Sequence, residues 1–222
     1  MVIINPAMLH KSIRDEVSNA TVRIVANGGS GVLVPGSLII TAAHCIEWNC
    51  TGAMAAWSGP RPLVEIRTHR GQNFLLEPYA VEPCSDIAVL GPADRENLAQ
   101  DCAAFDEFCQ STKPVTVSAE NFQHNQELEV HICGSRMRWV TGTAIQRAPF
   151  PLWTYVETSE EIAGGFSGGP IVTASGQLVG IVSWSGGTRM PNGKFSASFT
   201  RPHLALPTWI CSEIFGKASN GG

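Results

Sequence analysis

Short apolar runs, each closed by glycine, proline or asparagine, follow one another along almost the whole chain. Runs of this kind, bounded by turn residues, are typical of β-strands and are too short for the helices of a bundle. Strands are expected at residues 21–26, 31–34, 38–41, 63–68, 87–90, 115–117, 128–133, 140–145, 170–172 and 178–184. Many short strands at close spacing predict an all-β sandwich or barrel.

The composition excludes several other classes of protein. Gly and Pro number 22 and 14 of 222 residues, so the chain turns often and is not a coiled coil. Hydrophobic residues make up 44%, which is enough for a sizeable core and excludes intrinsic disorder. The net charge is −4 with no basic block, which argues against nucleic acid as a partner. No apolar run reaches about 18 residues, so we expect no membrane-spanning helix.

Two stretches have a helical pattern and divide the chain. Residues 94–110 are mixed in polarity and end near Pro114, and the tail is expected to be helical over 203–215. The first of these stretches leaves strand patterns of similar length on its two sides. The pattern therefore predicts two β-rich halves joined by a connecting segment.

The N-terminus is expected to form a short helix. Asn5 can cap a helix and Pro6 can open it, and Leu9, Ile13 and Val17 then fall on one face. We interpret this as an amphipathic helix packed on the domain, in preference to a membrane anchor. The segment lacks the basic start and long apolar core of a signal peptide.

Cysteine usage bears on the compartment and on metal binding. The seven cysteines are residues 45, 50, 84, 102, 109, 133 and 211. An odd count leaves a free thiol in a monomer, which with the lack of a signal peptide predicts a cytoplasmic protein. A secreted form whose signal peptide is missing from this chain is the alternative. Neither His44-Cys45 with Cys50, nor Cys102 with Cys109, has a paired zinc spacing, so no metal or other cofactor is expected.

Three segments carry residues suited to catalysis: TAAHC at 41–45, SDIAVL at 85–90 and GGFSGGP at 164–170. Together they resemble the trypsin-like, chymotrypsin-fold serine peptidases, in which His, Asp and Ser follow in this order. SWSG at 183–186 and FTR at 199–201 add to the resemblance, which covers about residues 21–215. The nucleophile elbow of α/β-hydrolases does not fit, because no aspartate follows Ser167 and Glu213 lies beyond His203.

The resemblance implies an all-β fold with two six-stranded antiparallel β-barrels of the chymotrypsin type. A C-terminal helix and a short N-terminal helix complete the expected architecture. The expected division is an N-terminal helical extension at 1–20, a first barrel with the connecting helical segment at 21–112, a second barrel at 113–202 and the C-terminal helix at 203–216. The site is then expected in the cleft between the barrels.

The same resemblance implies the catalytic residues His44, Asp86 and Ser167. A serine hydroxyl is a weak nucleophile near neutral pH and needs a base within hydrogen-bond reach. His44 would take the proton of Ser167, and Asp86 would hold the imidazole in one tautomer. The backbone N–H groups of Gly165 and Ser167 would form the oxyanion hole.

Substrate-binding residues are expected on both sides of the nucleophile. The strand with Ser183, Trp184 and Ser185 would pair with the backbone of the substrate. Glu161 lies six positions before Ser167, where the floor of the specificity pocket is expected, and would favour Arg or Lys before the scissile bond.

Alternatively, Glu160 and Glu161 lie on a solvated loop. A small or apolar side chain would then be preferred, in a pocket shaped by Ile162, Ala163, Ser185 and Ala197.

The chain departs from the secreted members of the family in two ways. Cys45 has lost its partner, whose place is near Ser30, and no cysteine lies between Cys133 and Cys211 to staple the pocket. Phe166 stands where zymogen-forming members have the aspartate that pairs with a new N-terminus. We therefore expect a bacterial or intracellular type whose pocket is ordered by packing of Phe166 into apolar surroundings.

The function predicted from the sequence is a serine endopeptidase that acts on protein or peptide substrates. Two alternatives stay open: a catalytically silent binding module with the same fold, and a peptidase that a regulatory protein partner activates. Labelling of Ser167 by a fluorophosphonate separates the first alternative from an enzyme.

Overall fold

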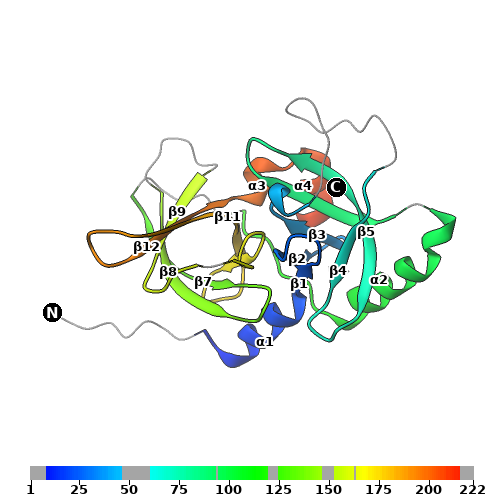
Figure 1. The fold of residues 1–222 in the computed structure, drawn as a ribbon, viewed down its shortest axis with the longest axis horizontal. Coiled ribbons are helices and arrows are strands. Elements are labelled where there is room, and N and C mark those ends of the chain that lie inside the picture. Colours follow the sequence, from blue (N-terminus) through cyan, green and yellow to red (C-terminus); the bar gives the residue numbers. More distant parts are fainter. Residues whose placement is uncertain are drawn as a thin grey trace, which may run out of the picture.

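Two closed β-barrels of six antiparallel strands each lie side by side in the computed structural model (Figure 1). The structure describes residues 9–46, 61–93, 95–119, 125–146, 153–162 and 164–215. The fold class expected from the resemblance is thereby confirmed. The chain passes from the first barrel to the second through the segment that contains helix α2, and its C-terminal tail returns to the first barrel.

The first barrel closes through the pairing of β1 with β4. Its strand order is β1-β2-β3-β6-β5-β4. The turns between β1, β2 and β3 are tight, as the glycines and Pro35 in this stretch predict. The strands are β1 (Thr21–Ile24), β2 (Ser30–Val34), β3 (Leu38–Thr41), β4 (Val64–Arg67), β5 (Asn73–Glu82) and β6 (Ile87–Pro92).

The second barrel repeats the arrangement with the order β10-β11-β12-β9-β8-β7. It closes through the pairing of β10 with β7. Its strands are β7 (Glu127–Cys133), β8 (Trp139–Ile145), β9 (Trp153–Thr158), β10 (Pro170–Val172), β11 (Leu178–Arg189) and β12 (Phe195–Thr200). Strand β10 begins directly after the GGFSGG run, so the second barrel anchors the loop of Ser167.

Three strands of the structure are not predicted by the sequence pattern, and one predicted strand is not part of a barrel. β5, β9 and β12 carry polar residues on their outer faces, and β5 contains Pro78 beside a shift in register. Residues 115–117 were expected to form a strand but make only an isolated bridge, Val117 with Leu178. Val115 N donates to Leu33 O at 2.9 Å, so this segment connects the two barrels without belonging to either sheet.

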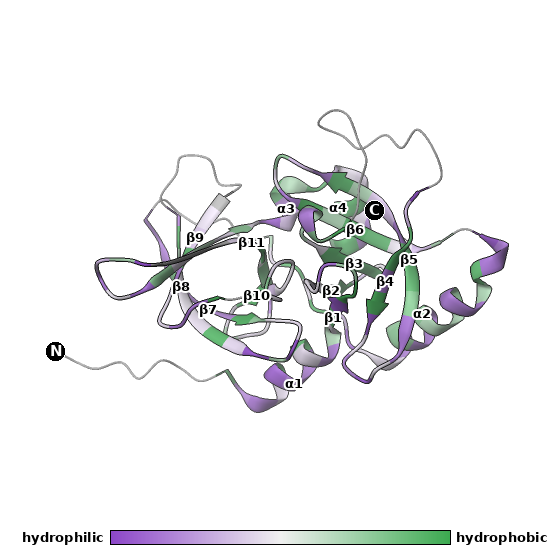
Figure 2. Ribbon diagram, in the orientation of Figure 1, coloured by the Kyte–Doolittle hydropathy of each residue, from purple (hydrophilic) through white to green (hydrophobic). Residues whose placement is uncertain are grey.

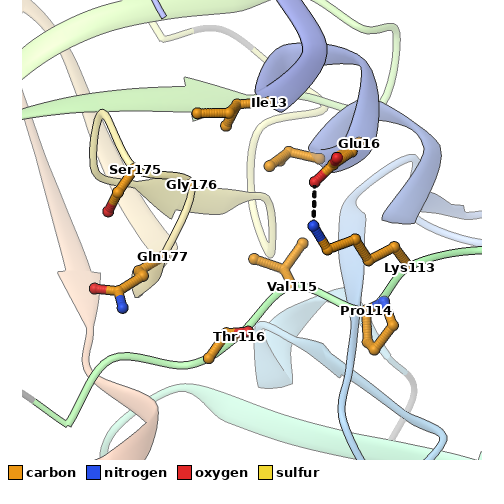
Figure 3. Close-up of a pocket in the computed structure, with 10 residues that line it drawn as sticks. Ile13, Glu16, Lys113, Pro114, Val115, Thr116, Ser175, Gly176 and Gln177 are labelled. Carbon is orange, nitrogen blue, oxygen red and sulfur yellow. Dashed lines mark hydrogen bonds and ion pairs between the residues drawn. The ribbon is translucent and has the colours of Figure 1, made fainter. Parts of the chain in front are cut away.

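Helix α1 (Lys11–Ala20) precedes the first barrel and begins at His10, whose side chain accepts a hydrogen bond from Ser12 N. Asn5 and Pro6, the expected cap and first residue, lie outside the described residues. Of the expected apolar face, Val17 is buried. α1 packs beside the 113–117 segment and the turn at 175–177, and Glu16 forms an ion pair of 2.8 Å with Lys113 (Figure 3). Both partners are largely exposed, so this ion pair adds little stability.

The helical stretch expected at 94–110 is a short 3₁₀ turn, η2 (Glu96–Leu98), followed by α2 (Ala99–Ser111). Asp94 lies outside the described residues. Phe105 and Phe108 of α2 are buried, and their ring centroids lie 5.3 Å and 5.7 Å from that of Phe74 on β5. The helix is therefore fastened to the outside of the first barrel by an aromatic cluster.

The tail forms two helices where one was expected: α3 (Pro202–Ala205) and α4 (Thr208–Phe215). Pro207 explains the break, because a proline disfavours helical backbone at the residue before it. Leu206 accordingly has an extended ψ of 148°. Ile210 and Ile214 of α4 are buried in the core of the first barrel, although the tail follows the second barrel in sequence.

Each barrel has its own buried core, and the apolar strands that form them are coloured green in Figure 2. The larger core, that of the first barrel, extends to α1, α2 and α4 and also includes Cys133, Val172, Leu178 and Ile181 of the second barrel. The smaller core lies among strands of the second barrel, with Ile162 and Phe166. Within the described ranges, no helix has both the length and the apolar character needed to cross a bilayer.

Candidate active site

The three residues expected to be catalytic come from loops at the ends of strands. His44 lies in the 3₁₀ turn η1 (Ala43–Cys45) after β3, and Asp86 lies in the turn before β6. Ser167 lies in the loop before β10 of the second barrel. Because β3 and β6 pair directly, with Thr41 opposite Ala88, the sheet itself brings His44 and Asp86 together.

The carboxylate of Asp86 holds the histidine in place through both oxygens. Asp86 Oδ2 lies 2.8 Å from His44 Nδ1, and Asp86 Oδ1 accepts the His44 backbone N–H at 2.9 Å. Ser183 Oγ of the second barrel donates to Asp86 Oδ2 at 2.5 Å. The hydrogen bond at Nδ1 orients the ring and leaves Nε2 available on its other side.

These contacts also raise the pKa of His44, to about 10 from its ordinary value of 6.5. The hydrogen bond to Asp86 is the largest cause and a hydrogen bond with Cys45 is the second, while partial burial opposes them. Both contacts favour the imidazolium form. The arrangement is therefore built to stabilise the charge that His44 acquires when it accepts a proton.

The loop of Ser167 is held against the end of the strand that leads to His44. Ser30 N of β2 donates to Ser167 O at 2.7 Å, and Gly168 N donates to Val182 O at 2.7 Å. A Cβ on Gly168 would collide with Ser30 O and lie 3.0 Å from Ala42 N, so only glycine fits there. Gly168 therefore lies against Ala42, which precedes His44 by two residues in sequence.

The structure does not join Ser167 to His44 by a hydrogen bond. Ser167 Oγ has no hydrogen-bond partner among the residues that the structure describes. Such bonds are often long in proteins without substrate and tighten when the substrate binds. His44 and Asp86 are thus placed as a hydrogen-bonded pair, and Ser167 lies in the adjoining loop.

The backbone around Gly165 has the conformation of a sharp turn, with φ of 95° at Gly165. Gly165 O accepts hydrogen bonds from Ser30 Oγ at 2.5 Å and from Ser135 N at 3.0 Å. Within the described part of the chain, the N–H groups of Gly165 and Ser167 donate to no other residue. The turn therefore fixes its carbonyl in the protein and leaves two donors unused.

Phe166 is buried, with 3% of its surface exposed, and belongs to the core of the second barrel. Its ring contacts the backbone of Gly134, where a Cβ would lie 3.1 Å from the ring atoms. The Arg138 guanidinium lies 5.6 Å from the ring centroid. The side chain between the two expected oxyanion donors is thus anchored by packing.

The residues expected in the specificity pocket are spread between the surface and the interior. Glu160 and Glu161 are exposed, and Arg138 Nη2 reaches both, at 3.4 Å from the Glu160 carboxylate and 3.2 Å from Glu161 O. Ile162 is buried, whereas Ala163 lies outside the described residues.

Of the β11 residues expected to bind substrate, Trp184 is 59% exposed and Ser183 is buried. Ser185 pairs with Ala197 of β12. The SWSG motif predicts the backbone pairing of its strand but not the hydrogen bond from Ser183 Oγ to Asp86 Oδ2, which joins residues far apart in sequence.

Two other observations bear on cofactors. Among the described residues, no three side chains of His, Cys, Asp or Glu are grouped closely enough to hold a metal ion. The six cysteines in this part of the chain are all free.

The chain matches known peptidases in sequence family and in fold. The family model of the trypsin-like peptidase domain matches residues 29–181. The inactive form of the Rv3671c protease has a TM-score of 0.56 and 16% identity, covering 90% of this chain and 93% of that one. The active form of the Rv3671c protease from M. tuberculosis has a TM-score of 0.59 and 15% identity, covering 95% and 87%. No curated protein matches the chain.

Proposed function

Because this serine peptidase belongs to the trypsin-like peptidase family, we propose that it cleaves internal peptide bonds with His44, Asp86 and Ser167 as catalytic residues. The observation that carries the proposal is the 2.8 Å contact of Asp86 Oδ2 with His44 Nδ1, beside the loop that holds Ser167. Acyl transfer to a serine requires a base beside the hydroxyl, and a carboxylate that orients this base.

The proposed reaction has two halves. His44 Nε2 accepts the proton of Ser167 Oγ as the oxygen attacks the carbonyl carbon, and the proton then passes to the leaving amine. A water molecule then gives a proton to His44 Nε2 as it attacks the acyl carbon. The proton passes to Ser167 Oγ as the ester bond breaks and the acyl group is released. Asp86 stays ionised and stabilises the imidazolium at each stage.

The N–H groups of Gly165 and Ser167 are proposed to bind the oxyanion of the tetrahedral intermediates. In support, both donors are unused within the described residues, and the turn between them is held by Phe166 and by the contacts of Gly165 O. Loss of one oxyanion donor typically lowers kcat by about 10²–10³-fold.

The pocket for the residue before the scissile bond is proposed to select a small or apolar side chain. Glu161 is exposed and its carbonyl is engaged by Arg138, whereas Ile162 is buried beside it. A matched peptide pair with Leu or Arg at that one position tests this, and faster cleavage of the Arg peptide would contradict it.

The activity itself is tested with a peptide library. We expect the wild-type protein to cleave internal bonds and Ser167→Ala to lose cleavage while it keeps its fold, as judged by circular dichroism. Cleavage by Ser167→Ala at the wild-type rate would refute the proposed nucleophile.

A second candidate, activation by a regulatory protein partner, is favoured by one observation. Ser167 Oγ has no hydrogen bond to His44 within the described structure. Such a peptidase would react slowly with a fluorophosphonate when alone and faster with its partner. Rapid reaction of the isolated protein would exclude this candidate.

A further inference from the structure

Two arginines lie directly opposite each other in the first barrel. Arg23 of β1 and Arg67 of β4 are partners in the register of the antiparallel sheet. Side chains of opposed residues lie on the same face, and like charges in this position destabilise a sheet. Within the described residues, neither arginine forms an ion pair that would offset the repulsion.

These arginines line a hollow of about 290 Å³ between the two barrels. The second barrel contributes its turn at 135–137, with Ser135 and Arg136, and the first barrel adds His69. We call this the basic hollow, defined by Arg23, Arg67, His69, Ser135 and Arg136. None of the described residues that line it is acidic.

The charge in the basic hollow is only partly satisfied by the protein. Arg23 Nε is shielded from solvent and has no hydrogen-bond partner among the described residues. Arg67 Nε donates to Asn73 Oδ1 at 2.9 Å, and Glu65 is reached only through that asparagine, at 3.0 Å. The side chains of Arg67 and Arg136 are exposed, and a carboxylate would supply an acceptor for their guanidinium groups.

The basic hollow adjoins the loop of the proposed nucleophile. Ser135 N donates to Gly165 O at 3.0 Å, and Ser135 Oγ donates to Gly28 O at 3.5 Å. Arg23 Nη2 lies 4.0 Å from where a Cβ on Gly28 would stand. The hollow therefore lies next to the backbone of Gly165, whereas Ser183 of β11 contacts Asp86.

We propose that the basic hollow binds an acidic side chain of the substrate on the C-terminal side of the scissile bond. The inference rests on the proposed function, together with the expected pairing of the substrate backbone with the strand of Ser183–Ser185. The peptide then leaves past Gly28 and Ser135, toward Arg23, Arg67 and Arg136. A carboxylate suits this hollow, because arginine forms paired, charge-assisted hydrogen bonds with carboxylates.

The test uses peptides that share one cleaved sequence and carry either Glu or Gln at successive positions after the scissile bond. At low salt, we expect kcat/KM of the wild-type protein to be about tenfold higher for Glu at one of these positions. The preference falls as NaCl is raised, because ions screen exposed charges. Equal rates for every Glu and Gln pair would overturn the proposal.

Variants connect the preference to the basic hollow. The double variant Arg67→Gln/Arg136→Gln is expected to bring the Glu-to-Gln ratio of kcat/KM close to one, and Arg67→Lys to keep most of it. Arg189→Gln is the matched control, because this exposed arginine on the β11–β12 hairpin donates to Gly193 O and is expected to keep the wild-type ratio. An unchanged ratio in the double variant would also overturn the proposal.

Binding to Ser167→Ala separates this proposal from the catalytic one. Calorimetry of this variant with the Glu and Gln peptides is expected to give about the same tenfold preference, without cleavage. If the wild-type protein cleaves neither peptide, the proposed peptidase activity fails, and the ratio of the two Kd values still tests whether the basic hollow binds an acidic side chain. Equal Kd values would refute the proposed role of the basic hollow and leave the peptidase proposal unaffected.

Discussion

Asp86 has a left-handed backbone conformation, with φ of 53°, which asparagine tolerates about as well as aspartate. Asp86→Asn therefore changes the charge beside His44 with little strain in the turn. It also removes the largest cause of the raised pKa of His44. The substitution is a clean probe of what the carboxylate does for the histidine.

The pH profile follows from the direction of this pKa shift. Because neutral His44 is the base and its pKa is raised to about 10, kcat/KM of the wild-type protein is expected to rise from neutral pH into the alkaline range. Asp86→Asn should lower kcat by about 10⁴-fold and move the rise toward pH 6.5, the ordinary pKa of histidine. A wild-type rate that is flat above pH 7 would contradict this prediction.

The same shift affects stability. The interaction of charged His44 with Asp86 contributes fully below pH 6.5 and is lost as the pH rises through about 10. Because His44 is about half exposed, the contribution is small. Urea titrations of the wild type and of His44→Gln should therefore converge as the pH rises from 6 to 11.

At the scale of elements, α1 is fastened to the second barrel as well as the first. A Cβ on Gly176, in the turn between β10 and β11, would lie 2.7 Å from Ile13 Cγ2 of α1. Trp139 Nε1 of β8 donates to Ser18 Oγ at 3.1 Å, and Arg14 lies 5.6 Å over the Trp139 ring. The helix thereby fixes one barrel relative to the other.

Gly176 offers a matched test of this packing. Gly176 and Gly193 have φ of 81° and 80°, so alanine is strained equally at both, but only Gly176 faces α1 closely. Gly193→Ala should lower the free energy of unfolding by about 1–2 kcal/mol from backbone strain alone, and Gly176→Ala by more. Adding Ile13→Ala should recover part of the loss at Gly176. Equal losses at the two glycines would show that α1 is not held there.

The same elements show what the sequence can and cannot predict. Strands with continuous apolar runs, such as 38–41 and 87–90, are visible because both of their faces are buried. β12 is not, because its serines lie on an outer face and its register depends on β9 and β11. The order of His44, Asp86 and Ser167 in the sequence predicted the hydrogen-bonded pair of His44 and Asp86. The basic hollow could not be predicted, because its residues come from separate strands and from the 135–137 turn and form no local sequence pattern.

At the scale of the whole molecule, polar contacts tie the barrels together around the site. Ser30 N donates to Ser167 O, Ser183 Oγ to Asp86 Oδ2 and Thr200 Oγ1 to Ser85 O, each from one barrel to the other. Phe166 fills the second barrel beneath the same loop. The loop of Ser167 is therefore held by contacts between the two barrels and by the packing of Phe166.

This leads to a prediction about activation. Acetylation of the N-terminal amine of the chain that begins at Met1 should leave kcat/KM unchanged within about twofold, since Phe166 cannot form an ion pair with an amine. Activity that appeared only after removal of the residues before Val22 or Ile24 would contradict this account.

The most direct measurement is the mass-spectrometric mapping of the adduct that a fluorophosphonate forms with the full chain. The account predicts one adduct, on Ser167, whose rate of formation rises with pH as His44 loses its proton and falls by orders of magnitude in His44→Ala. An adduct on another residue, or an unchanged rate in His44→Ala, would contradict the claim that His44 activates Ser167.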